Sequence, residues 1–166
     1  MIQDSGQKRE FESGAVRDFA EGKGRCDLLP LDIISEFLWH DDVLKCISNY
    51  VETGDVNSIY DAVHIVVNKS SFRLFPDHFT LVLEVAKHFE EGSKKYGDRN
   101  WQKGVPLHCY IDSAVRHYLK VLRGDDDERH DRAFVWNLLC CLWTQKHRPE
   151  MIDLPFANEE ENNDDL

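Results

Sequence analysis

The stretch PLHCYIDSAVRHYLKVLRG, residues 106–124, decides the fold class of this chain. Its apolar residues recur about every 3.6 positions, as on one side of an amphipathic helix. They are Cys109, Ile111, Ala114, Val115, Leu119 and Leu122. Pro106 is favoured in the first turn of a helix, and Gly124 is a common helix end. The stretch therefore predicts a helix that buries one side.

The same periodicity extends over most of the remaining chain. Further helices are predicted from Asp32 to Gly54 with an interruption at 40–42, from Asp55 to Asn68, from Pro76 to Gly92 or Gly97, and from Glu128 to just before Pro149. Strand signals are sparse, and a short hairpin remains possible in the amino-terminal arm or near 69–75. We therefore predict an all-α fold, a bundle of about five helices.

Composition divides the chain into three parts. Residues 1–29 form a loop-rich arm with a basic, glycine-rich loop, residues 30–150 form the helical domain, and residues 151–166 form an acidic tail. The last nine residues contain one apolar side chain, and we expect the tail to be disordered. At 166 residues, the chain is long enough for a single hydrophobic core.

Charge and cysteine content exclude several classes of protein. The net charge of -11 argues against a protein that coats nucleic acid, although it is compatible with a small phosphorylated ligand. Five cysteines without C-x-x-C spacing argue against a disulfide framework or a zinc ribbon. The sequence shows neither a signal peptide nor a membrane-spanning stretch. We expect a cytoplasmic protein that binds no membrane.

The predicted helix from residue 76 carries a polar face. Glu84, His88, Glu91 and Lys95 are spaced by four, three and four residues, so their side chains share one side of the helix. Carboxylates suit Mg²⁺, which makes Glu84, Glu91 and the neighbouring Glu90 candidate ligands. A solvated face with ion pairs is the alternative.

The start of the last predicted helix is strongly acidic. Glu128 and Asp131 form an E-x-x-D pair, and Asp127 and His130 lie at the same spacing. Both pairs are candidate metal sites. Capping of the helix amino terminus by acidic residues is the alternative, because the helix dipole favours negative charge there.

Three further polar residues on the last two predicted helices are candidates for the site. Arg116 is a candidate phosphate ligand and His117 a candidate proton carrier, although Arg116 could instead pair with Asp112 four residues earlier. Asn137 needs hydrogen-bond partners if it is buried. It could contact a base or make a structural contact.

The loop before Pro106 offers groups that could recognise a base. Tyr96 and Trp101 could stack on a purine, and the Asn100 amide could read its edge. Alternatively, Trp101 attaches the loop to the helices, as buried tryptophans commonly do.

The arm contains a short basic loop. Gly22 and Gly24 alternate with Lys23 and Arg25, so that backbone and positive charge could approach an anion closely. The G-x-x-x-x-G-K-[ST] spacing of a Walker loop is absent. Phosphate binding and ordinary loop chemistry both remain open.

Four segments together resemble a known family. GAVRDFAEGKGRCDLLP (14–30), EEGSKKYGDRNWQKGVP (90–106), DSAVRHYLKVLRGD (112–125) and HDRAFVWN (130–137) are similar to the dATP/dGTP diphosphohydrolases of phages and bacteria. The resemblance implies hydrolysis of dATP or dGTP to the monophosphate and pyrophosphate, in the manner of the all-α MazG-like enzymes. It also implies a bacterial or phage-infected cell, and by analogy a homo-oligomer with a purine nucleotide as partner.

The resemblance also implies a Mg²⁺ (or Mn²⁺) site. MazG-like enzymes hold the metal with an E-x-x-E and an E-x-x-D motif. Glu128 and Asp131 match the second motif, but Glu91 is followed three residues later by Lys94. The implied metal ligands are Glu84, Glu90, Glu91, Asp127, Glu128 and Asp131. The implied nucleotide-binding residues are Arg17, Lys23, Arg25, Lys95, Tyr96, Asn100, Trp101, Arg116 and Asn137.

His117 or His130 would move a proton in this mechanism. A rival arrangement places His117, His130 and Asp131 in an HD-type phosphohydrolase metal site. Two other functions stay open, a nucleotide-binding protein without turnover and an interaction module with an acidic tail.

Overall fold

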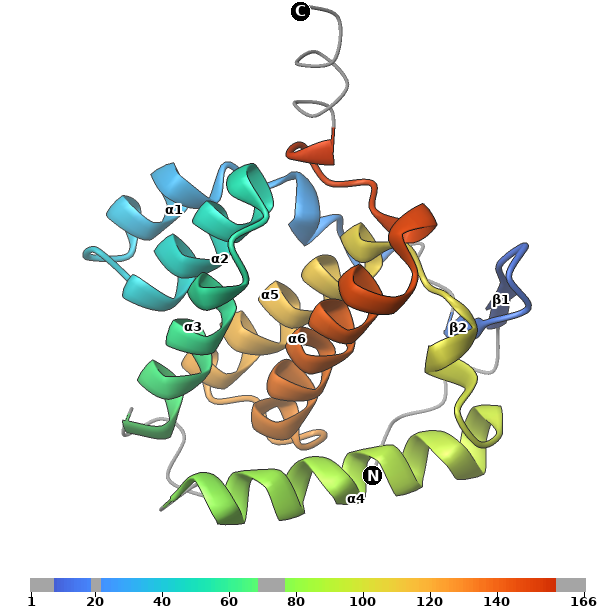
Figure 1. Cartoon of the computed structure of the whole chain (residues 1–166). Coiled ribbons are helices and arrows are strands. Elements are labelled where there is room, and N and C mark those ends of the chain that lie inside the picture. Colours follow the sequence, from blue (N-terminus) through green and yellow to red (C-terminus); the bar gives the residue numbers. More distant parts are fainter. Residues whose placement is uncertain (1–7, 19–21, 69–76, 158–166) are drawn as a thin grey trace, which may run out of the picture.

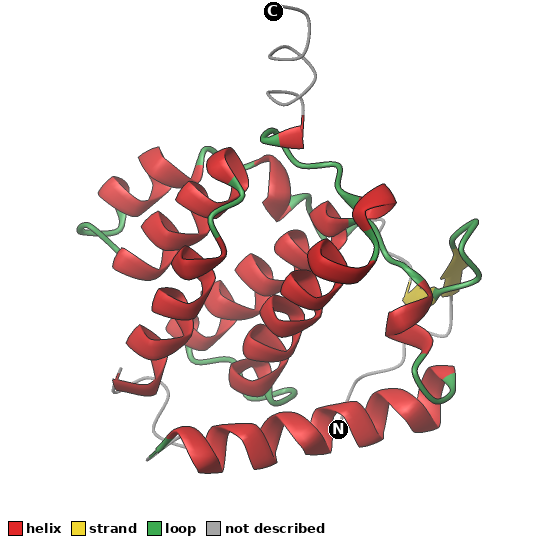
Figure 2. Ribbon diagram, viewed as in Figure 1, coloured by secondary structure: helices red, strands yellow, loops and turns green. Residues whose placement is uncertain are grey.

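The computed structural model describes residues 8–18, 22–68 and 77–157, which form an almost entirely helical protein (Figures 1 and 2). The α-helices in the described part are α1 (Leu31–Phe37), α2 (Asp42–Thr53), α3 (Val56–Asn68), α4 (His78–Tyr96), α5 (Leu107–Arg123) and α6 (His130–His147). Short 3₁₀ helices are η1 (Cys26–Leu28), η3 (Asn100–Lys103) and η4 (Pro149–Met151). The predicted all-α class is confirmed.

The first predicted helix is divided into α1 and α2. Trp39 and His40 adopt positive φ angles of 57° and 61°, which a continuous right-handed helix does not allow. Asp41 then caps α2, since its carboxylate accepts a hydrogen bond from the Leu44 amide at 3.1 Å. The predicted interruption at 40–42 therefore coincides with a true helix boundary.

The antiparallel pair α5 and α6 forms the centre of the molecule, with α1, α2 and α3 to one side (Figure 1). Gly124 ends α5 with a left-handed φ of 87°, which permits the sharp turn into α6. Fully buried side chains such as Ile47, Tyr118, Phe134 and Leu138 join these helices in one core.

Helix α4 lies along another side of this pair and packs against α6 (Figure 1). It begins after Asp77, whose carboxylate accepts a hydrogen bond from the Thr80 amide at 2.8 Å. Leu81, Val85 and His88 are its buried residues. The helix forms one wall of the cavity described below.

The amino-terminal arm contains an antiparallel hairpin of β1 (Lys8–Glu10) and β2 (Val16–Asp18), in which Arg9 pairs with Arg17. It is the small sheet in Figure 2. The expected hairpin thus occurs in the arm, while the other position considered, 69–75, lies outside the described residues.

The expected boundary of the acidic tail is placed too early. Residues 151–157 pack on the domain, since Leu154 is buried and the Phe156 ring lies 5.9 Å from that of Tyr50. Apolar side chains within this short segment make that packing favourable. Disorder was also expected for residues 158–166, which lie outside the described residues. Among the helices that are described, none has the length and apolarity to cross a membrane.

Candidate functional site

A cavity of about 570 Å³ lies between the arm, α4, α5 and α6. One part of its wall is aromatic and is formed by His88, Phe89, Trp101, Tyr110 and Trp136. Another part is cationic and is formed by Arg9, Arg17, Lys23, Arg116 and Lys120. His117, Asp127 and Glu128 line it as well. The cavity therefore combines apolar, cationic and potential metal-binding groups.

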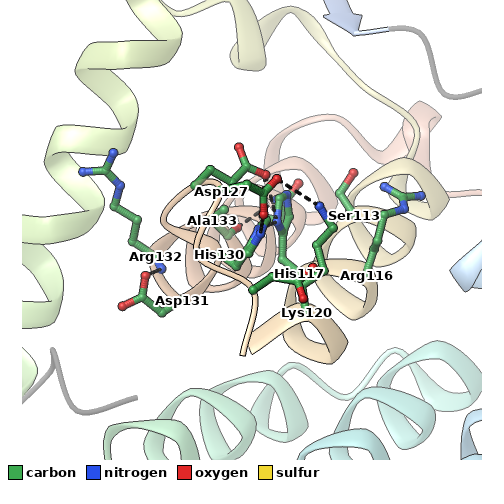
Figure 3. Close-up of polar contacts among 12 residues, drawn as sticks. Ser113, Arg116, His117, Lys120, Asp127, His130, Asp131, Arg132 and Ala133 are labelled. Atoms are coloured by element: carbon green, nitrogen blue, oxygen red, sulfur yellow. Dashed lines mark hydrogen bonds and ion pairs between the residues drawn. The ribbon is translucent and has the colours of Figure 1, made fainter. Parts of the chain in front are cut away.

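His117, Glu128 and His130 form a compact triad where α5 turns back into α6 (Figure 3). The Nδ1 atoms of the two histidines are 2.9 Å apart. Glu128 Oε1 lies 3.5 Å from His117 Nδ1 and 3.2 Å from His130 Nδ1. Three electron-pair donors thus point toward one another from α5, from the turn that follows it and from the first residue of α6.

The geometry of the triad fits a divalent cation. Ligand atoms about 2.1 Å from one ion lie about 3.0 to 3.4 Å from each other in octahedral or tetrahedral coordination. The three distances of 2.9, 3.2 and 3.5 Å fall around this range. Lone pairs that converge in this way repel one another unless a cation or a proton lies between them. We conclude that these three residues can hold a metal ion.

Asp127 supports His130 from behind. Its carboxylate oxygen lies 2.7 Å from His130 Nε2, and its other oxygen lies 3.5 Å from Lys120 Nζ. When the carboxylate accepts a hydrogen bond from Nε2–H, the lone pair of the imidazole is on Nδ1 and is directed into the triad. Carboxylate–histidine pairs of this kind orient metal ligands.

The triad is shielded from solvent. His130 is 2% exposed. Burial, followed by the proximity of His130, keeps the pKa of His117 well below its usual value. His117 is therefore neutral near pH 7, which is the form that binds metals.

Five of the six carboxylates predicted as metal ligands lie outside the triad, and all of these except Asp127 are paired with cations elsewhere. Glu84 Oε2 accepts a hydrogen bond from Arg129 Nη1 at 3.1 Å, and Glu91 Oε1 accepts one from Arg132 Nη2 at 2.6 Å. Asp131 accepts from Arg129 Nε at 2.9 Å. Together Glu84, Glu91, Arg129, Asp131 and Arg132 form an ion-pair seam between α4 and α6. Glu90 pairs with Lys94 on the helix surface.

The E-x-x-D pair is accordingly divided, with Glu128 in the triad and Asp131 in the seam. In Figure 3, Asp131 and Arg132 point away from His117 and His130. The HD-type hypothesis placed His117, His130 and Asp131 at one metal site. The two histidines do meet in the structure, but the carboxylate beside them is that of Glu128 and not that of Asp131. A second group of potential ligands, Asp125, Asp127 and His130, includes a carboxylate already paired with Arg123.

Arg17 is held in a fixed position at the cavity wall. Its Nη2 donates to Ser113 Oγ at 3.1 Å and to Asn137 Oδ1 at 2.9 Å, and its Cζ lies 5.0 Å from the Tyr110 ring centre. Its Nη1 is buried without a hydrogen-bond partner. Asn137 also donates to the Ala133 carbonyl at 2.8 Å. Both sides of the Asn137 amide are thus engaged, and Asn137 positions Arg17.

The basic loop of the arm reaches the cavity through Lys23 alone. Burial lowers the pKa of this amine, partly offset by Asp18. Arg25 instead donates to Asp27 at 2.7 Å. Arg116 is paired with Asp112 and donates to the carbonyls of Lys23 and Gly24 at 3.3 and 3.1 Å, so it attaches the arm to α5.

Tyr96 and Asn100, which were expected to contact the base, and Lys95, which was expected to contact the phosphates, instead hold the arm in place. Lys95 Nζ and the Tyr96 hydroxyl each donate to Asp18 at 2.7 Å. Asn100 accepts from the Val16 amide at 2.9 Å and donates to its carbonyl at 2.8 Å, as a neighbouring strand would. Their ordered contacts fix β2, which carries Arg17.

Trp101 connects the loop to the helices and also lines the cavity. Its ring lies 5.2 Å from that of Phe89 and 4.8 Å from that of Trp143. Both expectations for this residue, attachment of the loop and a place in the site, are compatible with its position.

Sequence reasoning did not select several residues of the cavity wall. Ser113 and Lys120 lie one helical turn on either side of His117, so helical spacing could have identified them. His88 was predicted only to share a polar helix face with Glu84, Glu91 and Lys95. It packs against Trp136 with ring centres 5.2 Å apart, and burial lowers its pKa to about 4. Arg9 and Trp136 carried no comparable signal.

Comparison with known proteins identifies the family of this chain. Searches of curated proteins and of solved structures found no match. Residues 65–154, which include the whole triad, match the sequence model of the family described as "dATP/dGTP diphosphohydrolase, N-terminal". This match covers more than half of the chain, and the chain therefore belongs to the dATP/dGTP diphosphohydrolase family.

Proposed function

We propose that this protein is a metal-dependent diphosphohydrolase of purine deoxynucleoside triphosphates, with its site in the cavity between α4, α5, α6 and the arm. One observation carries the proposal: a triad suited to a divalent cation opens onto the same cavity as an aromatic wall and a set of cations. Triphosphate, base and metal ion each have complementary groups there.

His117, Glu128 and His130 would hold the cation. Imidazole ligands favour transition metals over Mg²⁺, so this set suits Mn²⁺ better than the purely carboxylate site implied by the MazG-like motifs. A divalent cation in this place would polarise a phosphate group and lower the pKa of a bound water. Asp127 would keep the His130 ring oriented.

The triphosphate would lie along the cationic wall. Arg17 is restrained by Ser113 and Asn137, so little conformational entropy is lost when it binds an anion. Lys23 is partly buried, and its charge gains strength from the lower dielectric around it. Lys120 lies beside Asp127 at the entrance to the triad.

The base would lie against the aromatic wall. Trp101 and Trp136, which are partly exposed, offer ring faces and edges on which a purine can stack. The amides of Asn100 and Asn137 are already hydrogen-bonded to the protein, and we therefore assign neither of them to reading the base.

The proposed reaction is attack of water on the α-phosphorus. A new oxygen–phosphorus bond forms while the bond to the bridging oxygen breaks, and pyrophosphate leaves. Arg17 and Lys23 would stabilise the negative charge that develops on the leaving group.

The test is incubation of the full chain with dATP or dGTP and either Mn²⁺ or Mg²⁺, with pyrophosphate and monophosphate measured separately. Pyrophosphate release that is lost in Glu128→Gln and retained in Asp131→Asn supports the proposal, because these two residues of one E-x-x-D pair lie in the triad and in the seam. Nucleotide binding without any product would instead indicate a nucleotide-binding protein. Loss in Asp131→Asn alone would contradict the assigned metal site.

A further inference from the structure

A second group of reactive side chains lies at the start of α5, outside the triad. It consists of Cys109 in the first turn of the helix, the preceding His108, Asp153 from the segment after η4, and Arg9 from β1. His108 Nε2 lies 3.3 Å from Cys109 Sγ, and Arg9 Nη2 lies 3.2 Å from the same sulfur. Asp153 hydrogen-bonds to His108 Nδ1 through its other carboxylate oxygen while it accepts from the His108 amide at 3.0 Å.

This arrangement has the parts of an activated nucleophile. A thiol contacts a histidine base, and a carboxylate orients the base through its other ring nitrogen. The hydrogen bond to Asp153, followed by that to Cys109, raises the pKa of His108 to about 10. The helix amino terminus and Arg9 add positive charge beside the sulfur. Arg9 and His108 both contact the Cys109 sulfur, where they can stabilise the negative charge of a thiolate nucleophile.

The surroundings of the other cysteines differ, although Cys26 interacts with Arg116. Burial raises the pKa values of Cys26 and Cys46 at partly exposed positions, and those of Cys140 and Cys141 in the core. Cys109 is 2% exposed, but the two side chains that contact its sulfur, Arg9 and His108, are partly exposed. Arg9 Nε is also buried without a hydrogen-bond partner, so its guanidinium is incompletely satisfied where it lies. A small reagent can reach the sulfur once these side chains move.

We propose that Cys109 is a site of thiol–disulfide exchange with small, uncharged disulfides. The thiolate form of Cys109, beside protonated His108 and Arg9, attacks one sulfur of the reagent. A bond forms between the two sulfurs as the reagent's own disulfide bond breaks. The leaving thiolate takes the proton from His108 Nε2, and no further oxidant is needed.

Modification of Cys109 should also affect the cavity, through Arg9. Arg9 pairs with Arg17 in the hairpin, and both side chains line the cavity. A group attached to Cys109 Sγ would displace Arg9 Nη2 from its present contact. Weaker nucleotide binding is the expected consequence, and this consequence alone rests on the proposed function.

The test is exposure of the folded full chain to 2-hydroxyethyl disulfide at pH 7, followed by peptide mass mapping. We expect Cys109 to react at least about tenfold faster than Cys26 or Cys46, although both are more exposed. In guanidinium chloride this preference should disappear. Faster reaction of Cys26 or Cys46 in the folded protein would overturn the proposal.

Two variants separate activation from mere exposure. His108→Gln removes the base, and Asp153→Asn removes the orienting charge while keeping an acceptor for the His108 amide. Each should slow modification of Cys109 about tenfold while the far-ultraviolet circular dichroism spectrum stays unchanged. Unchanged rates in both folded variants would overturn the proposal. Because the readout is the mass of the peptide, the result is independent of any nucleotide hydrolysis.

Discussion

The triad and the α4–α6 seam both contain carboxylates that the sequence offered as metal ligands, and yet they differ in chemistry. In the triad, His117, Glu128 and His130 direct three electron-pair donors toward one point at the cavity. In the seam, every carboxylate meets an arginine, as Glu91 meets Arg132 at 2.6 Å. A carboxylate that is neutralised by arginine is a poor metal ligand, because the ion would have to displace its partner. The surroundings of a carboxylate thus decide its role.

The largest difference between the two regions should appear when one residue of the triad is removed. His130→Ala should lower the rate of pyrophosphate release at least about 100-fold, because a catalytic metal contributes several kcal/mol of transition-state stabilisation. The measurement is steady-state hydrolysis of dATP and dGTP in Mn²⁺. Activity within twofold of the unmodified protein would show that the triad is not the metal site.

In the seam, the corresponding change should affect stability. Arg132→Gln removes the ion pair with the half-buried Glu91, and we expect a loss of about 2 kcal/mol in the free energy of unfolding. Urea unfolding followed by circular dichroism measures this quantity. If Arg132→Gln lowered the rate of pyrophosphate release by more than the decrease in its folded fraction explains, the seam would have a catalytic role, and the distinction from the triad would be wrong.

The role of Asp127 in orienting His130 can be tested by a single substitution. Asp127→Asn removes the charge behind His130 Nε2 but keeps a hydrogen-bond acceptor. We expect about tenfold weaker Mn²⁺ binding, the usual effect of changing a group that orients a metal ligand. Isothermal titration with Mn²⁺, without nucleotide, gives the affinity directly. Tighter binding would refute the supporting role.

The smallest effect is expected at Glu90, which neighbours Glu91 in sequence but pairs with Lys94 on the surface. Glu90→Gln should change the free energy of unfolding by less than about 0.5 kcal/mol, because exposed ion pairs contribute little. Urea unfolding measures this quantity, and Glu91→Gln, measured in the same way, is the matched control. A larger effect at Glu90 than at Glu91 would show that the two carboxylates have been assigned to the wrong environments.

Most of the helical fold was predictable because its signals are local. The period of apolar residues, the caps Asp41 and Asp77, and the glycine at 124 each act within a few residues of the boundary that they define. The tail boundary was missed because Leu154 and Phe156 gain their burial from distant residues. No local pattern distinguishes a short apolar segment that packs from one that does not.

The site was less predictable. Helical spacing places Glu84, His88 and Glu91 on one side of α4, but it says nothing of the arginines on α6 that occupy this side. Likewise, Asn100 and Arg116 are polar groups of the right kind for a nucleotide. In the structure, Asn100 binds the backbone of β2 and Arg116 binds that of the arm.

The sequence by itself determined the all-α class, nearly all helix boundaries and the family, since these depend on local periodicity and on segments that can be compared directly. Only the tertiary structure decided which polar groups meet. Neighbours in sequence such as His130 and Asp131 point about 100° apart on a helix, one toward the triad and the other toward α4. Their chemistry depends on the helix that packs against each side, and that packing is set by the core as a whole.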